Sequence, residues 1–199
     1  MIIKGWHGWV GTFTGVALIT VAALPLAALA VCALARQRSV TANTPAEAWR
    51  MSLAEVGIVY GTVPWVWMTM LPGDRAGTAP SRVSLLPLRD LLTIAAAGPL
   101  TLAAQIVGNL LVFAALGFFA PQRFAALASV PRILALAAGC SVLVETAQYV
   151  LQLDRVSSVD DVLLNTAGAA LAALASRRWW RATARAPSDR PRSASLPRP

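Results

Sequence analysis

The sequence predicts an all-α integral membrane protein, a helical bundle of about five transmembrane helices with a short amphipathic or re-entrant segment before the third. Of its 199 residues, 57% are hydrophobic and only 13% are charged, which is much less charge than soluble domains carry. The hydrophobic residues gather in stretches close to the ~20 residues that a helix needs to cross a bilayer. The charges lie mostly at the ends of these stretches, as membrane insertion requires.

Composition also excludes several classes of function. The net charge of +8 comes from arginines at hydrophobic boundaries and in the C-terminal tail, which indicates membrane orientation and contact with anionic lipids rather than nucleic-acid binding. His7 is the only histidine, which argues against histidine triads and zinc sites. Cys32 and Cys140 lie within apolar stretches and are interpreted as packing residues. We therefore expect no cofactor, with a divalent cation as the one alternative that carboxylates leave open.

The predicted spanning helices cover residues 9–35, 52–71, 98–120, 133–153 and 159–176. The first is longer than a signal-peptide core, which favours a retained helix over a cleaved leader or a signal anchor. Before the second, Asn43-Thr44-Pro45 signals a turn or a helix start. We therefore divide the chain into three regions. Residues 1–50 contain the first helix and its connection, residues 51–178 form the main transmembrane domain, and residues 179–199 form a disordered basic tail.

The connection between the second and third helices contains a short apolar piece. Residues 75–90 are typical of a loop, and VSLLPLRDLL at its end indicates an amphipathic or re-entrant segment. Its leucines would lie on a membrane surface while Arg89 and Asp90 face water. In the third helix, Gln105 and Asn109 are four residues apart on one face, an arrangement that suits contact with a neighbouring helix.

The distribution of positive charge predicts the orientation. Five spans place the two termini on opposite sides of the membrane, with twelve positive residues on the side of the C-terminus and five on the other. The positive-inside rule then places the C-terminal tail in the cytoplasm and the N-terminus outside. The connections at residues 72–97 and 154–160 would both face outward.

The last two predicted helices carry the strongest functional signal. Polar residues recur at helical spacing on each of these helices. We expect one outward-opening site to be formed by Glu145, Gln148, Arg155, Asp160, Asp161 and Asn165. An ionisable side chain at membrane depth costs several kcal/mol, by roughly 2.5–3.5 on insertion scales, so it usually has a function or a partner. Glu145 suits general acid or base chemistry, and Asp161 could orient a hydroxyl or bind a cation. Arg155 suits a phosphate.

Each of these residues also has a structural interpretation. Asp160, and less readily Asp161, could cap the start of the last helix. Gln148 and Asn165 could join helices, and Arg155 could pair with Asp154 or Asp160. Gln105 is interpreted as a packing residue, whereas Asn109 is balanced between packing and substrate binding. Neither a cap nor an interfacial position explains Glu145, so a functional role is favoured there.

The polar residues resemble the VanZ-like family of bacterial membrane proteins, named for a teicoplanin-resistance protein. Residues 145–168 resemble its E-x-x-Q…R…D-D…N-T-x-G pattern, and the resemblance extends over residues 55–176. Three positions depart from the pattern: Ser84 replaces an asparagine, Ala115 a proline, and Ser158 an aspartate. The resemblance implies a compact multi-helix domain connected with glycopeptide resistance or with the handling of cell-envelope lipids.

We therefore expect a membrane protein that acts on or binds an envelope lipid or a lipid-linked head group. In the enzymatic version, Glu145 and Asp161 are catalytic, and Asn109, Gln148 and Asn165 position the substrate. The alternative is a non-catalytic protein that binds or shields a lipid or an antibiotic. A small transporter is the weakest hypothesis, because no inverted repeat is apparent in the sequence. Anionic lipids are expected at the basic tail.

Overall fold

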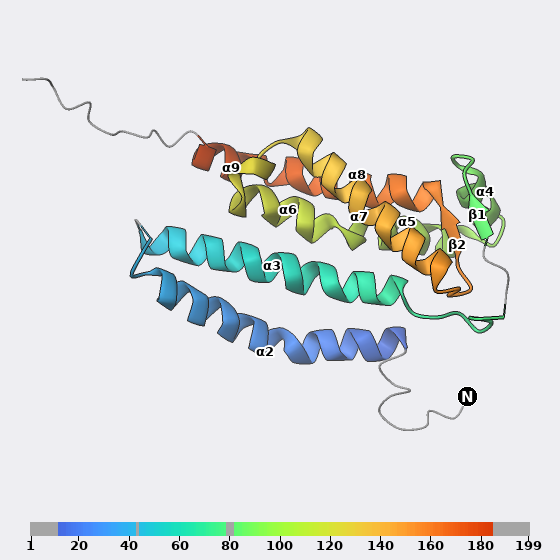
Figure 1. The fold of residues 1–199 in the computed structure, drawn as a ribbon, viewed down its shortest axis with the longest axis horizontal. Helices are drawn as coiled ribbons and strands as arrows, with labels where there is room; N and C mark the ends of the chain where they lie inside the picture. Colours follow the sequence, from blue (N-terminus) through green and yellow to red (C-terminus); the bar gives the residue numbers. More distant parts are fainter. Residues whose placement is uncertain (1–11, 43, 79–81, 185–199) are drawn as a thin grey trace, which may run out of the picture.

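The computed structural model describes residues 12–42, 44–78 and 82–184, and this part of the chain is mostly helical. Long helices run side by side and alternate in direction, while the short strands and α4 lie together at one end (Figure 1). We call this the strand end, and the other the α9 end. The elements are α2 (Phe13–Arg38), α3 (Pro45–Thr69), β1 (Arg82–Ser84), α4 (Arg89–Ala95), α5 (Pro99–Val112), α6 (Ala114–Arg123), η1 (Ala125–Leu127), α7 (Val130–Val150), β2 (Val156–Ser158), α8 (Val159–Ala175) and α9 (Arg177–Ala184).

Three stretches are long and apolar enough to cross a membrane, by length and composition, among the described residues. These are α2, α7 and the rod Pro99–Arg123, in which α5 and α6 are separated at Phe113. The predicted helices at residues 52–71 and 159–176 are present as α3 and α8. However, α3 contains Glu55 and several tryptophans, and α8 has 17 residues. The prediction of a helical membrane protein is thus confirmed, while five spans remain a prediction.

The polar connection after α2 is shorter than the sequence predicts. The helix α3 begins at Pro45, seven residues before the predicted start, because Thr44 provides a cap. The Thr44 hydroxyl accepts a hydrogen bond from the backbone N–H of Glu47 at 3.2 Å. Pro45 occupies the first turn, where the backbone N–H that proline lacks would have no partner within the helix. The helix-start signal at residues 43–45 is thereby confirmed for Thr44 and Pro45, whereas Asn43 lies outside the described residues.

A parallel pair of three-residue strands joins two distant connections at the strand end. Arg82 of β1 is in register with Val156 of β2, and Ser84 with Ser158. The sequence predicts only a loop here, because such short strands have no local hydrophobic pattern and exist only through their pairing. The pairing ties the segment before α4 to the start of α8 and so closes the strand end of the bundle.

Within the segment predicted to be amphipathic or re-entrant, the structure has the end of β1 and the short helix α4, and its membrane-surface or re-entrant position remains a prediction. Leu85, Leu86 and Leu92 are exposed, as predicted, and so is Arg89. Asp90 differs from the prediction, because it is half-buried and lines a cavity rather than facing water.

Close helix packing around α8 depends on glycine. A Cβ atom added to Gly168 would lie 1.9 Å from the carbonyl oxygen of Leu110 on α5. At Gly117 of α6, the same atom would lie 2.0 Å from the carbonyl oxygen of Ala169. Small residues at these crossings let the α5–α6 rod approach α8 backbone to backbone. This approach brings the polar side chains of α5 within reach of α8.

The C-terminal region is helical further than the sequence predicts. The predicted tail begins at residue 179, but α9 continues to Ala184. Trp180 is buried and donates from its indole Nε1 to the carbonyl oxygen of Ala173 at 3.1 Å, while the Trp179 ring lies 5.5 Å from that of Phe118. These two tryptophans dock the helix, which composition alone does not reveal. Residues 185–199 lie outside the described residues.

Candidate functional site

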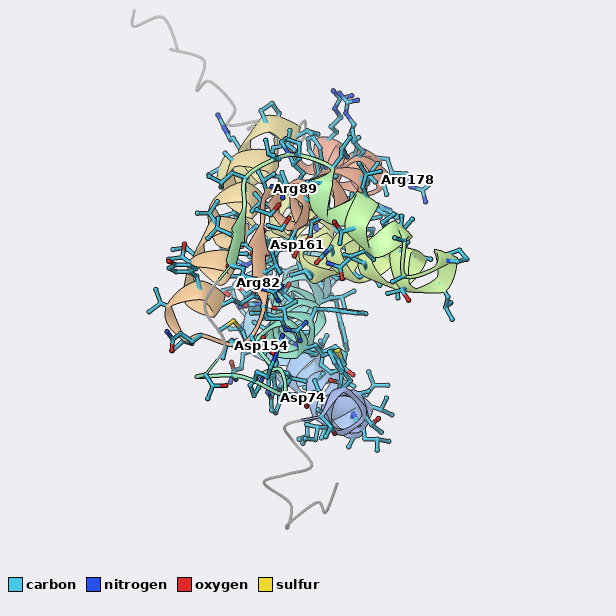
Figure 2. All side chains as sticks on the ribbon, turned by 90° about the vertical axis from the view of Figure 1, so that its right-hand side faces the viewer. Asp74, Arg82, Arg89, Asp154, Asp161 and Arg178 are labelled. Carbon is cyan, nitrogen blue, oxygen red and sulfur yellow. The ribbon has the colours of Figure 1, made fainter. Side chains whose placement is uncertain are left out.

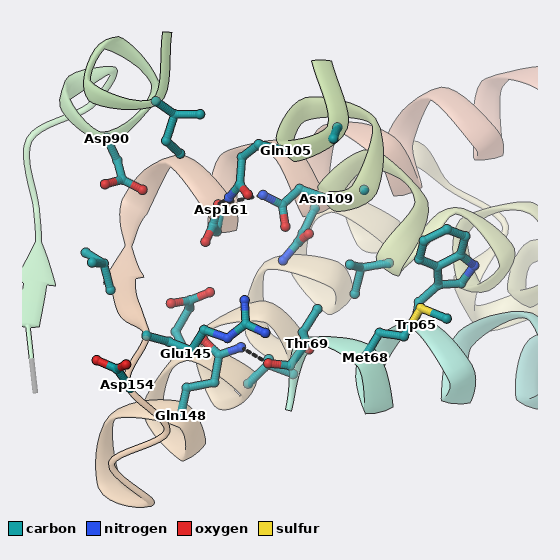
Figure 3. Close-up of a pocket in the computed structure, with 18 of the residues that line it drawn as sticks. Trp65, Met68, Thr69, Asp90, Gln105, Asn109, Glu145, Gln148, Asp154 and Asp161 are labelled. Atoms are coloured by element: carbon teal, nitrogen blue, oxygen red, sulfur yellow. Dashed lines mark hydrogen bonds between the residues drawn. The ribbon is translucent and has the colours of Figure 1, made fainter. Parts of the chain in front are cut away.

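A cavity of about 590 Å³ lies at the strand end, between α3, α4, α5, α7, β2 and α8. Its charged and amide lining residues are Arg82, Asp90, Gln105, Asn109, Glu145, Gln148, Asp154, Arg155, Asp161 and Asn165. Figure 2 looks onto this end and shows Arg82, Asp154 and Asp161 there. The apolar side chains Trp65 and Met68 lie at the opposite side of the cavity from Asp90 and Glu145 (Figure 3). The cavity is therefore amphipathic.

Glu145 is fixed by one of its two carboxylate oxygens. Its side chain comes from α7, and the residue is only 8% exposed. Oε2 accepts a hydrogen bond from the backbone N–H of Ser158 at 3.0 Å, and the Ser157 hydroxyl donates to the Glu145 carbonyl oxygen, also at 3.0 Å. The other oxygen, Oε1, makes no hydrogen bond within the described part of the chain. Glu145 thus holds β2 in place and keeps one acceptor for another group.

Asp161 has the same kind of half-occupied carboxylate. Its Oδ1 accepts from Gln105 Nε2 at 2.9 Å and from Asn109 Nδ2 at 2.5 Å, both on α5 (Figure 3). No described residue donates to Oδ2. The four-residue spacing of Gln105 and Asn109 aims both amides at α8, as the sequence predicts. Gln105 thereby belongs to the site, although sequence reasoning assigns it to packing.

The mouth of the cavity is formed by the turn after α7 and the end of α3. Gln148 donates from Nε2 to the carbonyl oxygen of Thr69 at 2.9 Å (Figure 3). Arg155 donates from Nη2 to the carbonyl oxygen of Leu71 at 3.3 Å, and its Nε is buried without a partner. Asp154 pairs with Arg75 at 3.5 Å instead of with Arg155. Among the described residues, Arg155 forms no ion pair with Asp154 or Asp160. The predicted alternative of such a pair is therefore wrong.

Asn165 closes the floor of the site. It is 2% exposed, and its Nδ2 donates to the Ser141 hydroxyl at 2.8 Å, which joins α8 to α7 as predicted for an interhelical contact. Its Oδ1 is buried and has no hydrogen-bond partner. Because a buried, unsatisfied oxygen costs about 1–3 kcal/mol, the position favours a donor that is supplied by a ligand or by water.

Asp160 faces away from the cavity and caps a different helix from the one expected. It is 2% exposed, and its two oxygens accept from the backbone N–H groups of Leu88, Asp90 and Leu91 at 2.5, 3.1 and 3.2 Å. These are the free amides at the start of α4. The bonds also hold Leu88 in the left-handed region at φ 67°, a conformation that is costly for a branched residue. The start of α8 is capped by the Ser158 hydroxyl.

The position of α4 has an electrostatic consequence for Asp90. Burial raises the pKa of this carboxyl above its ordinary value, and the negative charge of Asp160 raises it further, while Arg82 opposes the shift. A cation that binds beside Asp90 would reverse this effect by stabilising the ionised form.

The structure thus brings together most of the sequence-predicted site residues. Around one cavity lie Asn109, Glu145, Gln148, Arg155, Asp161 and Asn165. Asp160 is not among its lining residues, because its carboxylate is occupied by the α4 backbone. Sequence reasoning missed Gln105, Arg82 and Asp90. Gln105 is signalled by its spacing from Asn109, whereas Arg82 and Asp90 reach the cavity only through the β1–β2 pairing and the Asp160 cap.

The comparisons with known proteins agree with this arrangement. The sequence model of the VanZ/LLP1 family matches residues 58–180, which is more than half of the chain. The chain belongs to the VanZ/LLP1 family. The match runs from within α3 into α9, so it includes every polar residue of the cavity, whereas α2 lies outside it. Curated proteins and solved structures gave no match.

The VanZ/LLP1 site does not present a metal centre in its described part. No group of three or more His, Cys, Asp or Glu side chains there has an arrangement that could hold a metal ion. What the geometry offers is a set of half-occupied carboxylates, two guanidinium groups and several amides around a partly apolar cavity. Such a set can bind a polar group by hydrogen bonds and can accept or donate a proton.

Proposed function

We propose that this VanZ/LLP1-family protein is a multi-pass protein of the bacterial cytoplasmic membrane that binds the head group of an envelope lipid, or of a lipid-linked precursor, in the cavity. One observation carries the proposal: charged groups at one side of the cavity face apolar side chains at the other. A lipid has the same division between head group and acyl chain. The helix α3 packs closely on α6 and touches α5 little, so the seam between α3 and α5 is a route for a lipid from the bilayer.

We also propose that the cavity faces the outside of the cell. The support is the charge distribution, because the α9 end contains Arg36, Arg38, Arg50, Arg123, Arg132, Arg177, Arg178 and Arg181. The positive-inside rule assigns that end to the cytoplasm. Thr78 is exposed near the cavity end. In a variant with Cys32 and Cys140 replaced by alanine, Thr78→Cys should react with an impermeant maleimide in intact cells, and reaction only after permeabilisation would contradict the orientation.

In this proposal, Glu145 is the general base or acid of a reaction on the head group. Asp161, held by two amides, would orient the reacting hydroxyl or bind a cation, while Asn109, Gln148 and Asn165 would position the substrate. The Glu145→Gln variant should lose the activity and remain folded, because an amide oxygen can still accept from the Ser158 N–H. Lipid mass spectrometry of membranes with wild-type protein, variant and no protein would detect the modified lipid.

A non-catalytic shielding protein is the second candidate. It is favoured by the protein hydrogen bonds that Glu145 and Asp161 both already make, since these fix the carboxylates as a binding surface would require. If the protein only shields, strains with and without the wild-type protein should have the same lipid profile and differ in susceptibility to teicoplanin. Comparing lipid profile and teicoplanin susceptibility in the same strains separates the two candidates.

We further propose that anionic lipids bind at the cytoplasmic end, beside α9. The helix presents Arg177, Arg178 and Arg181, and the Arg178 guanidinium lies 4.5 Å from the centre of the Trp179 ring. Arginine next to tryptophan is typical of membrane interfaces. Replacing the three arginines by glutamine should lower the amount of phosphatidylglycerol that copurifies with the protein, and an unchanged amount would contradict the proposal.

A further inference from the structure

The cavity contains charges of both signs that form no ion pairs with one another among the described residues. Of its four carboxylates, Asp154 is paired with Arg75, which lies outside the cavity lining. The other three, Asp90, Glu145 and Asp161, form no ion pair with any described residue. The same holds for the two guanidinium groups of the lining. Because isolated charges are costly away from bulk water, each set favours a ligand of the opposite charge.

The two guanidinium groups of the lining, those of Arg82 and Arg155, both come from the strand end of the bundle. The β1–β2 register places Arg82 opposite Val156, the residue that follows Arg155. Arg155 uses Nη2 for a single long bond to a carbonyl oxygen, and its buried Nε has no partner. Most of the donors of its planar fork therefore remain available, which is the pattern that binds a phosphate in two places.

The carboxylates offer acceptors of a different kind. Glu145 Oε1 and Asp161 Oδ2 receive no hydrogen bond from the described residues, although Glu145 is only 8% exposed. The buried Oδ1 of Asn165 adds a third unsatisfied acceptor. The three residues lie on α7 and α8, and all of them line the same cavity. A primary ammonium group has three donors and a positive charge, so it matches such a set, whereas a quaternary ammonium group has no N–H to donate.

We infer that the cavity selects a zwitterionic head group that contains both a phosphate and a primary ammonium group. Arg155 and Arg82 bind the phosphate, and Glu145 and Asp161 accept hydrogen bonds from the ammonium. A purely anionic head group would leave the carboxylates unpaired beside its own negative charge. This inference rests on the proposed binding of a lipid head group and names its chemical class.

The test requires a probe that reports on the cavity alone. Gly108 lines the cavity, and a Cβ atom added there would meet no atom within 4 Å. Full-length protein with Cys32 and Cys140 replaced by alanine and with Gly108→Cys would be placed in nanodiscs of phosphatidylcholine, whose head group lacks N–H donors. The rate of maleimide alkylation at position 108 is then measured after adding phosphatidylethanolamine or phosphatidylglycerol of the same acyl chains.

Phosphatidylethanolamine should slow alkylation by about tenfold, the effect of one or two charge-assisted hydrogen bonds, while phosphatidylglycerol should not. Asp161→Asn should remove this protection, and Arg155→Gln should reduce it as well. Asp154→Asn is the matched control, since its carboxylate lines the same cavity but is already paired, and protection should persist. Soluble phosphoethanolamine should also protect the thiol if the head group itself is recognised, and protection by the lipid alone would restrict recognition to the membrane-bound form.

The outcomes separate this inference from the proposed function. Equal protection by phosphatidylethanolamine and phosphatidylglycerol would overturn the zwitterion selectivity and leave head-group binding intact. If neither lipid protects the thiol relative to phosphatidylcholine, the selectivity is overturned. If detergent-solubilised protein binds none of the three lipids, the proposed function is overturned. If Asp161→Asn protein does not fold, Glu145→Gln serves as the second variant, with folding checked by thermal denaturation.

Discussion

The two ends of the bundle use carboxylates that are withdrawn from solvent in opposite ways. At the α9 end, Glu55 on α3 is bonded through one oxygen to Arg38 of α2 and through the other to Arg123 of α6. At the strand end, Glu145 and Asp161 each have one oxygen occupied by protein donors and one without a described partner. The same functional group therefore completes a structural contact at one end and leaves an acceptor beside a cavity at the other.

The difference indicates how to distinguish a structural acid from a functional one in a membrane protein. An acid at membrane depth is unusual in either case, so its presence alone decides nothing. What decides is whether each of its two oxygens has a donor within the protein. By this criterion Glu55 and Asp160 are structural, while Glu145 and Asp161 retain capacity for a ligand. Substitutions at the two ends should consequently differ in what they change.

The largest loss of stability is expected at Glu55. Glu55→Gln removes the negative charge between Arg38 and Arg123, and one neutral amide oxygen cannot serve both guanidinium groups. We expect a loss of about 2–3 kcal/mol, less than for a fully buried ion pair because the three side chains are partly exposed, measured by thermal denaturation in detergent. The head-group preference of the protein that remains folded should be unchanged. A variant with wild-type stability would show that the Arg38–Glu55–Arg123 contact is not structural.

The close approach of α5 to α8 gives the next effect. Gly168→Ala would place a methyl group against the Leu110 backbone and push α5 away, which also separates Asn109 from Asp161. A loss of about 1–3 kcal/mol is expected from overpacking. The control is Gly139→Ala on α7, where an added Cβ meets no atom within 4 Å and helix propensity should raise stability slightly. Equal effects of the two substitutions would contradict the close-packing account.

A smaller loss is expected at Asp160. An asparagine in this position would retain one acceptor oxygen but turn an N–H donor towards the α4 amides, so Asp160→Asn should cost about 1–2 kcal/mol. Because α4 carries Asp90 to the cavity, protease sensitivity of residues 85–95 should increase and lipid protection at position 108 should weaken. Unchanged proteolysis and unchanged protection would show that Asp160 does not position α4.

The smallest effect is expected at the pair of Asp154 and Arg75. Arg75 is largely exposed, with 69% of its side chain accessible, and exposed pairs contribute about 0–1 kcal/mol. Arg75→Gln should therefore change the denaturation midpoint little, and less in high salt. A loss as large as that of Glu55→Gln would mean that the two ends are not distinguished by burial of their ion pairs.

The sequence predicts the helices and most of the site because both depend on local spacing. Gln105 and Asn109 share a face, as do Glu145 and Gln148, and hydropathy locates the rods on which they lie. The sequence does not predict β1 and β2, the role of Asp160, or the contribution of Arg82, because these features arise from contacts between residues about 70 positions apart. The extension of α9 depends on the burial of Trp180, which composition assigns to a tail.

A ligand-induced thermal shift tests whether Glu145 retains its free oxygen for a ligand. Denaturation midpoints of wild-type, Glu145→Gln and Glu55→Gln proteins would be compared in phosphatidylcholine mixed micelles with and without phosphatidylethanolamine. We predict that Glu145→Gln keeps the wild-type midpoint without the added lipid and loses the shift, whereas Glu55→Gln lowers the midpoint and keeps the shift. A Glu145→Gln variant that is destabilised yet fully lipid-responsive would contradict the account.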